Sequence, residues 1–146
     1  MTRIIVFKPG HLDFMVNIRD SFIDDPGAKD RLEDHGNREG VYGYTFIHKD
    51  KPVAAVFASV MFGRMCDIVA ITTDGIYECR FSFFRSCKSL MKSMTQKKGI
   101  TRFQLTTKAG YRQASRFAES LGFKHEGVLE RFGADDATYH IYGRTV

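Results

Sequence analysis

The chain has 146 residues, of which 43% are hydrophobic and 27% charged, and its net charge at pH 7 is +5 with histidine neutral. This balance is typical of a globular domain and excludes a disordered, collagen-like or coiled-coil chain. No apolar run reaches the roughly 18 residues that a membrane-spanning helix needs. The apolar start, Met1–Phe7, is too short for a signal peptide. We therefore expect one domain over residues 1–146, no membrane association and a cytoplasmic location.

Three cysteines, Cys66, Cys79 and Cys87, are widely spaced. This odd number fits neither a disulfide framework nor a zinc pattern, so we expect free, buried thiols. The 22 basic residues outnumber the 17 acidic ones. Such a surplus favours an anionic partner, which could be a phosphate-bearing cofactor, nucleic acid or an acidic protein, and solubility alone also explains it.

The first third of the chain predicts one strand and two helices. Residues 3–7 are apolar and β-rich, and they predict a strand. Leu12, Met15, Ile18 and Phe22 recur at helical spacing, which predicts a helix over 11–22. Asp24–Gly27 interrupts the pattern, and a short, exposed helix is expected over 28–35, opened by Pro26. Gly36–Gly40 is expected to be a loop.

The next segment predicts an antiparallel meander. Residues 42–48, 53–62 and 65–72 are rich in β-formers. Short turns separate them at Lys49–Pro52 and Gly63–Arg64. Three strands joined by such short turns pair as successive hairpins.

The last half predicts alternating helices and strands. A long helix is expected over 81–98, because Phe84, Cys87, Met91 and Met94 form one apolar stripe and Gly99 follows as its C-terminal residue. A strand over 100–106, a helix over 112–121 and a hairpin of 123–131 with 137–142 complete the chain. The strand–helix–strand unit from Met65 to Thr106 should cross over right-handed, making its strands parallel. The predicted fold class is α/β, a mixed, mostly antiparallel sheet of about seven strands flanked by helices.

One segment carries a recognisable pattern. It reads FQLTT, then ASRFAESLGFKHEGVLER, then YHIYG. This resembles the C-terminal half of the GNAT superfamily of N-acetyltransferases, in which a strand leads to a short helix that ends in Leu-Gly-Phe. The matching positions are Ala114, Leu121, Gly122, Phe123, Glu126 and Gly127. The resemblance implies a GNAT-like acyl-CoA N-acyltransferase fold and transfer of an acetyl group from acetyl-CoA to an amine.

In that family the cofactor pyrophosphate lies at the N-terminus of the central helix, on a loop with the pattern Arg or Gln, two residues, Gly, one residue, and Gly or Ala. Here no glycine occurs between Gly75 and Gly99, and the expected loop reads YECRFSFFR. Basic side chains at the start of the helix could hold the phosphates instead, or they could simply be solvated. The resemblance and these cations give the expected cofactor-binding residues, which are Ile71, Thr72, Thr73, Arg80, Arg85 and Lys88.

The catalytic groups of the family are also altered. The position often held by the acid Tyr is Ala118, and Tyr111 stands where the family often has Asn. Tyr111 could have taken over as acid, with a packing aromatic as the alternative. No base is evident: Asp67 and Glu78 are candidates, with surface carboxylates as the alternative. His48 and His140, in predicted strands, are expected to be structural.

Three functions remain open. The first is an acetyl-CoA-dependent acyltransferase acting on an amine that the sequence does not identify. The second is a non-catalytic GNAT-like scaffold with a protein partner, in a phage virion or host cytoplasm. Some short proteins of tailed phages, including internal virion proteins, resemble this scaffold in its C-terminal half and have a similarly eroded glycine loop. A nucleic-acid binder ranks last, because the basic residues are scattered among acidic ones. An enzyme requires an open cleft between the strand ending near Thr72 and the strand from Thr101. A scaffold would have it filled by Phe81, Phe83 or Phe84, with Phe83 the expected plug or exposed anchor.

Overall fold

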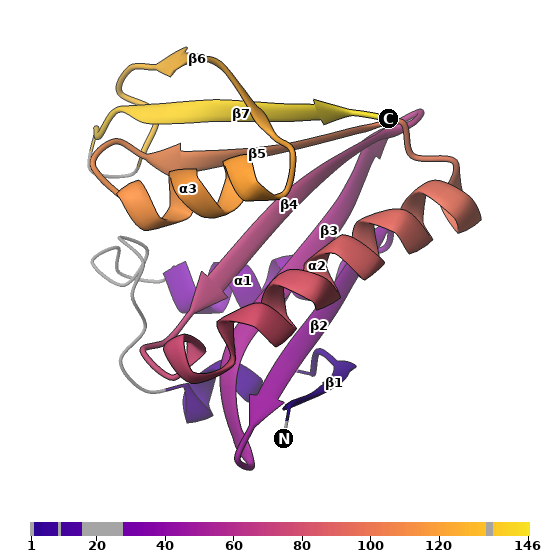
Figure 1. The fold of residues 1–146 in the computed structure, drawn as a ribbon, viewed down its shortest axis with the longest axis vertical. Helices are drawn as coiled ribbons and strands as arrows, with labels where there is room; N and C mark the ends of the chain where they lie inside the picture. The colour runs from indigo at the N-terminus through magenta and orange to yellow at the C-terminus, as the bar shows by residue number, and fades with distance from the viewer. Residues whose placement is uncertain (1, 9, 16–27, 134–135) are drawn as a thin grey trace. The chain divides into compact units, whose positions relative to one another are not determined.

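The structure is a computed structural model that describes residues 2–8, 10–15, 28–133 and 136–146 (Figure 1). Seven strands form one sheet in the order β1-β2-β3-β4-β5-β7-β6. The elements are β1 (Thr2–Val6), the 3₁₀ helix η1 (His11–Phe14), α1 (Ala28–Gly36), β2 (Val41–His48), β3 (Lys51–Phe62), β4 (Met65–Thr72), α2 (Ile76–Lys98), β5 (Arg102–Lys108), α3 (Arg112–Ser120), β6 (Lys124–Leu129) and β7 (Tyr139–Thr145). The predicted fold class is therefore confirmed, including the parallel pairing of β4 with β5.

Two compact units divide the chain. Unit 1 comprises residues 1–59 and 69–83, and unit 2 comprises residues 60–68 and 84–146. β3, β4 and α2 each contribute residues to both units. A single domain over residues 1–146 stays a prediction.

The core of unit 1 is built on close contacts between aromatic rings and glycine backbone. Phe7 and Phe57 pack edge-to-face with ring centroids 4.7 Å apart. A Cβ at Gly36 would lie 2.6 Å from a ring carbon of Phe57, and one at Gly43 would lie 2.9 Å from Cβ of Phe7. Glycine at these two positions lets α1 and β2 approach the two rings. The cluster is completed by Leu12, Met15, Leu32, Ala55 and Ile71.

The predicted helix over 11–22 is wrong at its start. Residues 11–14 form the 3₁₀ helix η1 instead of an α-helical turn, and Met15 is already extended, with φ −82° and ψ 122°. Leu12 and Met15 are both buried in the unit 1 core, and their spacing of three residues suits a 3₁₀ turn as well as an α-helix. Residues 16–22 and Pro26 lie outside the described residues. The helix predicted over 28–35 is confirmed as α1.

Unit 2 explains the Leu-Gly-Phe motif. Helix α3 ends in a Schellman arrangement: the Phe123 N–H donates to the Ala118 carbonyl at 3.0 Å, and the Gly122 N–H donates to the Glu119 carbonyl at 2.9 Å. Gly122 has a left-handed φ of 90°, which a side chain would strain. Leu121 and Phe123 on either side are both buried. The motif therefore ends the helix and anchors β6 to the unit 2 core.

A bulge in β6 supports an ion pair that crosses the neighbouring strand. The β6–β7 register shifts between His125 and Gly127, so Glu126 is an extra residue. Its carboxylate accepts a hydrogen bond from Arg102 Nη1 of β5 at 3.0 Å, although β7 lies between these strands. A Cβ at Gly143 of β7 would lie 2.5 Å from the carboxyl carbon of Glu126. Only glycine at position 143 leaves room for the crossing.

We predict that Gly143→Ala breaks this ion pair and lowers the free energy of unfolding by about 1–2 kcal/mol, because the added methyl occupies the carboxylate's position. Glu126→Gln alone should cost less, up to about 1 kcal/mol, since the pair is partly solvated. Urea unfolding of the single and double variants would show that Glu126→Gln costs almost nothing in the Gly143→Ala background.

The matched control is Gly127→Ala, because a Cβ there meets only Ile141 at an ordinary 3.6 Å. Equal losses at positions 127 and 143, or additive losses in the double variant, would contradict the steric account.

Candidate functional site

The connection from β4 to α2 is tied to β3. Thr73 is buried, and both its N–H and its hydroxyl donate to the Val53 carbonyl, at 2.9 and 3.2 Å. The same hydroxyl accepts a hydrogen bond from the Gly75 N–H at 3.3 Å. Ile71 places its side chain in the unit 1 core, and Thr72 is half-buried. Of these three predicted cofactor residues, Thr73 already uses its N–H and its hydroxyl as donors within the fold.

Helix α2 begins five residues earlier than predicted, at Ile76 rather than at Phe81. Cys79 interrupts it with a non-helical φ of −127° and ψ of 22°. The first turn is therefore set off from the regular helix at the place where the family's phosphate loop was expected. Large side chains occupy it: Tyr77 and Phe81 are 50% and 68% exposed.

The predicted phosphate-binding cations lie in solvent. Arg80 belongs to unit 1, and its guanidinium stacks on the Phe81 ring at 5.0 Å. Arg85 and Lys88 belong to unit 2, and the Lys88 ammonium lies 5.5 Å from the centre of the Phe84 ring. All three side chains are exposed, and none forms an ion pair with another residue in the described part of the chain. They are free to neutralise an anion.

Phe83 is a core residue, so of its two predicted roles the exposed anchor is wrong, and the role of plug stays a prediction. Its side chain is 3% exposed and packs edge-to-face on Phe46, with ring centroids 4.9 Å apart, inside unit 1. Phe84 packs edge-on to Phe117 within unit 2. The early start and the kink of α2 change which face each ring presents, and Phe81 is the ring left in solvent.

Glu78, a candidate base, sits in a polar cluster of unit 1. Its carboxylate accepts from Lys49 Nζ at 2.8 Å and lies 3.3 Å from His48 Nε2. The other ring nitrogen of His48 lies 3.1 Å from the Thr2 hydroxyl. The bond from Lys49 is the largest cause that lowers the pKa of Glu78. A carboxylate held ionised in this way is a weak base, and it joins the first turn of α2 to the β2–β3 turn.

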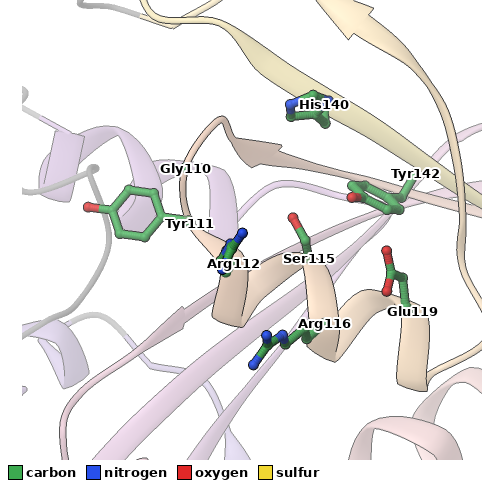
Figure 2. A pocket seen from close by; sticks show the side chains of 8 residues that line it. All are labelled: Gly110, Tyr111, Arg112, Ser115, Arg116, Glu119, His140 and Tyr142. Carbon is green, nitrogen blue, oxygen red and sulfur yellow. The ribbon is translucent and has the colours of Figure 1, made fainter.

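The other two catalytic candidates lie in unit 2. Asp67 is half-buried on β4, opposite Gln104 in a parallel ladder of three residue pairs. Tyr111 is the residue that precedes α3 and makes no side-chain capping bond. It lines an open pocket of about 350 Å³ (Figure 2). The pocket residues are Gly110, Tyr111, Arg112, Ser115, Arg116, Glu119, His140 and Tyr142.

Sequence reasoning missed most of this pocket. Tyr111, Ser115 and Glu119 follow one another at a spacing of four, which places them on one side of α3. That spacing was available in the sequence, whereas the contribution of β7 depends on strand order. His140 was expected to be structural, and it does hydrogen-bond to His125, with Nδ1 and Nε2 2.8 Å apart. It also faces the pocket.

The cysteines are free and buried, as predicted. Burial raises the pKa of Cys66 and of Cys87 to about 12. Neither thiol supplies a nucleophile near neutral pH. Within the described ranges, no three metal-ligating side chains come together, and no helix is long and apolar enough to cross a membrane.

Solved structures share this chain path. A variant of the spermidine N-acetyltransferase SpeG from Vibrio cholerae has a TM-score of 0.72 at 13% identity, over 99% of this chain and 93% of that one. A GNAT-family acetyltransferase from Bacillus anthracis has a TM-score of 0.63 at 13% identity, over 81% and 72%. RimL, a ribosomal α-N-protein acetyltransferase in complex with coenzyme A, has a TM-score of 0.66 at 14% identity, over 81% and 73%. This chain has the GNAT fold.

The GNAT resemblance seen in the C-terminal segment is thus confirmed as a fold that extends over nearly the whole chain. No protein-family model and no curated protein sequence matches the chain. Identities of 13–14% leave the fold as the shared property.

We predict that Phe83→Ala lowers the free energy of unfolding by about 3 kcal/mol, because it empties a packed ring site. Phe81→Ala, two positions away, is the matched control and should change it by less than about 0.5 kcal/mol. Denaturant unfolding of both variants measures the difference. Similar losses for the two would show that Phe81 also packs in a core.

Glu78→Gln should lower the melting temperature near neutral pH. The folded pKa of Glu78 is depressed, so its stabilising contribution is present above the unfolded carboxyl value of about 4.3 and is lost as the pH falls through the folded pKa. Calorimetry across this range should show wild type and variant converging in acid. A difference that stays constant with pH would rule out the ion pair as its source.

Proposed function

We propose that the chain binds an acyl-CoA, acetyl-CoA in the first place, and transfers the acyl group to an amine. The supporting observation is the GNAT fold, shared over 99% of the chain with a spermidine N-acetyltransferase and over 81% with a CoA-bound acetyltransferase. When bound, the thioester would supply an activated acyl group. Every other contribution must come from residues of this chain.

The described residues fit a side-chain grip on the cofactor better than a glycine loop. Arg85 and Lys88 of unit 2, and separately Arg80 of unit 1, are exposed, and no carboxylate of the described chain neutralises them, so each of these cations suits a phosphate group. Backbone groups at Ile71, Thr72 and Thr73 are the proposed contacts for the rest of the cofactor, with the Thr73 donors already used by Val53. The grip should therefore depend on charge and weaken with added salt.

Proton transfer requires an acid and a base. We propose Tyr111 as the acid, because its side chain makes no capping hydrogen bond to α3 and lines a pocket. Asp67 is the preferred base, because Glu78 is held ionised by Lys49. Glu78 remains as the weaker proposal.

A second candidate is a non-catalytic GNAT-fold protein that binds a protein partner. The observation in its favour is the start of α2, where Cys79 and Phe81 stand at the expected glycine loop and where the side chains of Tyr77 and Phe81 are exposed. Exposed aromatic side chains are frequent anchors of protein interfaces.

Isothermal titration of the full chain with acetyl-CoA tests the proposal. We expect low-micromolar binding, weakened about three- to tenfold by Arg80→Gln or Arg85→Gln, because each removes a charge-assisted hydrogen bond. Lys124→Gln, which removes an exposed charge from β6, is the control and should leave binding unchanged.

Acetyl transfer should then be assayed with spermidine and with a peptide bearing a free α-amine. Binding followed by transfer supports the enzyme. Binding without transfer to any amine overturns the catalytic half of the proposal. Absence of acetyl-CoA binding overturns the whole proposal and leaves the non-catalytic binder.

A further inference from the structure

The pocket of unit 2 lies between one side of α3 and the face of β7 that carries His140 and Tyr142. Figure 2 shows Ser115 and Glu119 of α3 directed toward these strand residues. Its volume of about 350 Å³ is in the range of small-molecule sites. The proposed transfer reaction uses Tyr111 of this pocket but not Arg112, Ser115, Glu119 or His140, so these four side chains call for an explanation of their own.

Opposite charges mark the two ends of the pocket. Arg112 is the first residue of α3, Arg116 is its middle residue, and Glu119 lies near its end. None of these three side chains forms a hydrogen bond or an ion pair with any residue that the structure describes. Arg112 and Glu119 are seven residues apart, which corresponds to about 10 Å along a helix axis. The pocket therefore offers an unpaired cation and an unpaired anion at a fixed spacing.

Neutral hydrogen-bonding groups line the space between these charges. The Ser115 hydroxyl lies 3.3 Å from the hydroxyl of Thr107, and either oxygen can donate. The His140 ring is held by His125 through the 2.8 Å contact, and His125 packs edge-on to Tyr142. His125 lies directly opposite Tyr142 in the β6–β7 ladder and therefore on the same face as Tyr142 and His140, so this pairing fixes the wall.

We propose that this pocket binds a short zwitterion of peptide length, with its carboxylate on Arg112 and its ammonium on Glu119. Arg favours carboxylates through paired hydrogen bonds, and Glu favours ammonium groups. A simple anion would be repelled by Glu119, and a simple polyamine would be repelled by the two arginines. Three extended residues span about 10 Å, which matches the spacing along α3.

The site goes beyond the proposed transfer reaction, because it requires no acyl donor. Its occupant is defined by charge and length: a tripeptide or an equally long aminocarboxylate. A single amino acid is too short to reach both ends.

A length and charge series of ligands tests the proposal by isothermal titration or NMR shift mapping of the full chain. Triglycine should bind more tightly than diglycine, and glycine should not bind measurably. N-acetyltriglycine lacks the ammonium and triglycinamide lacks the carboxylate, so each should bind about two- to fivefold more weakly than triglycine.

Two variants test which end of the pocket binds which charged group of the ligand. Arg112→Gln should weaken triglycine and N-acetyltriglycine two- to fivefold but leave triglycinamide unchanged. Glu119→Gln should weaken triglycine and triglycinamide but leave N-acetyltriglycine unchanged. Both side chains are exposed and without partners, so both variants should keep the wild-type melting temperature. Arg131→Gln, which removes an arginine outside the pocket, is the matched control and should change none of the three affinities.

No binding of triglycine, or equal binding of the free and capped peptides, would overturn the zwitterion site. Loss caused equally by Arg131→Gln would show non-specific charge effects and would also overturn it. Acetyl-CoA binding measured on the same samples separates the two proposals: peptide binding can fail while acetyl-CoA binding persists, and the reverse can also occur.

Discussion

The ion pair between Glu126 and Arg102 depends on a steric constraint in unit 2, the close passage of Glu126 over Gly143. It joins β6 to β5 across β7, and it exists only because position 143 carries no side chain. His125, which precedes the extra residue, is paired directly with Tyr142 and contacts His140, so the same strand pairing sets this wall of the pocket. Arg102 also keeps the pKa of Glu126 below its usual range, so the pair stays charged near neutral pH.

In unit 1, glycine residues also permit close contacts, in this case with aromatic rings. Gly36 and Gly43 admit Phe7 and Phe57, and Gly75 lets the chain after β4 approach Val53. These close approaches leave little freedom at the start of α2. The first turn of that helix is further held by Glu78 through Lys49 and His48. The GNAT resemblance predicted that the backbone at the start of α2 would bind phosphates. In this chain, side-chain contacts hold that segment instead.

The sequence predicted the strands well, because β-branched and aromatic runs between short turns have few alternatives. It also predicted α3, since Gly122 marks a helix end that only a left-handed residue completes. The start of the helix predicted over 11–22 was wrong because the apolar spacing of Leu12 and Met15 does not separate a 3₁₀ turn from an α-helix. The start of α2 was missed because Cys79 breaks the helical periodicity. As a result, Phe83 was placed off the apolar face of the helix, whereas its side chain is buried. The pocket could not be foreseen because strand order, not spacing, brings His140 and Tyr142 over α3.

The deeply enclosed thiols carry one more implication. Cys66 and Cys87 would ionise only near pH 12, and ionisation is the first step of sulfur chemistry with peroxides, electrophiles or glutathione. The folded chain is therefore indifferent to the redox poise of its surroundings at these two positions. Alkylation of Cys66 or Cys87 therefore requires unfolding, and its rate measures how often unfolding exposes these thiols.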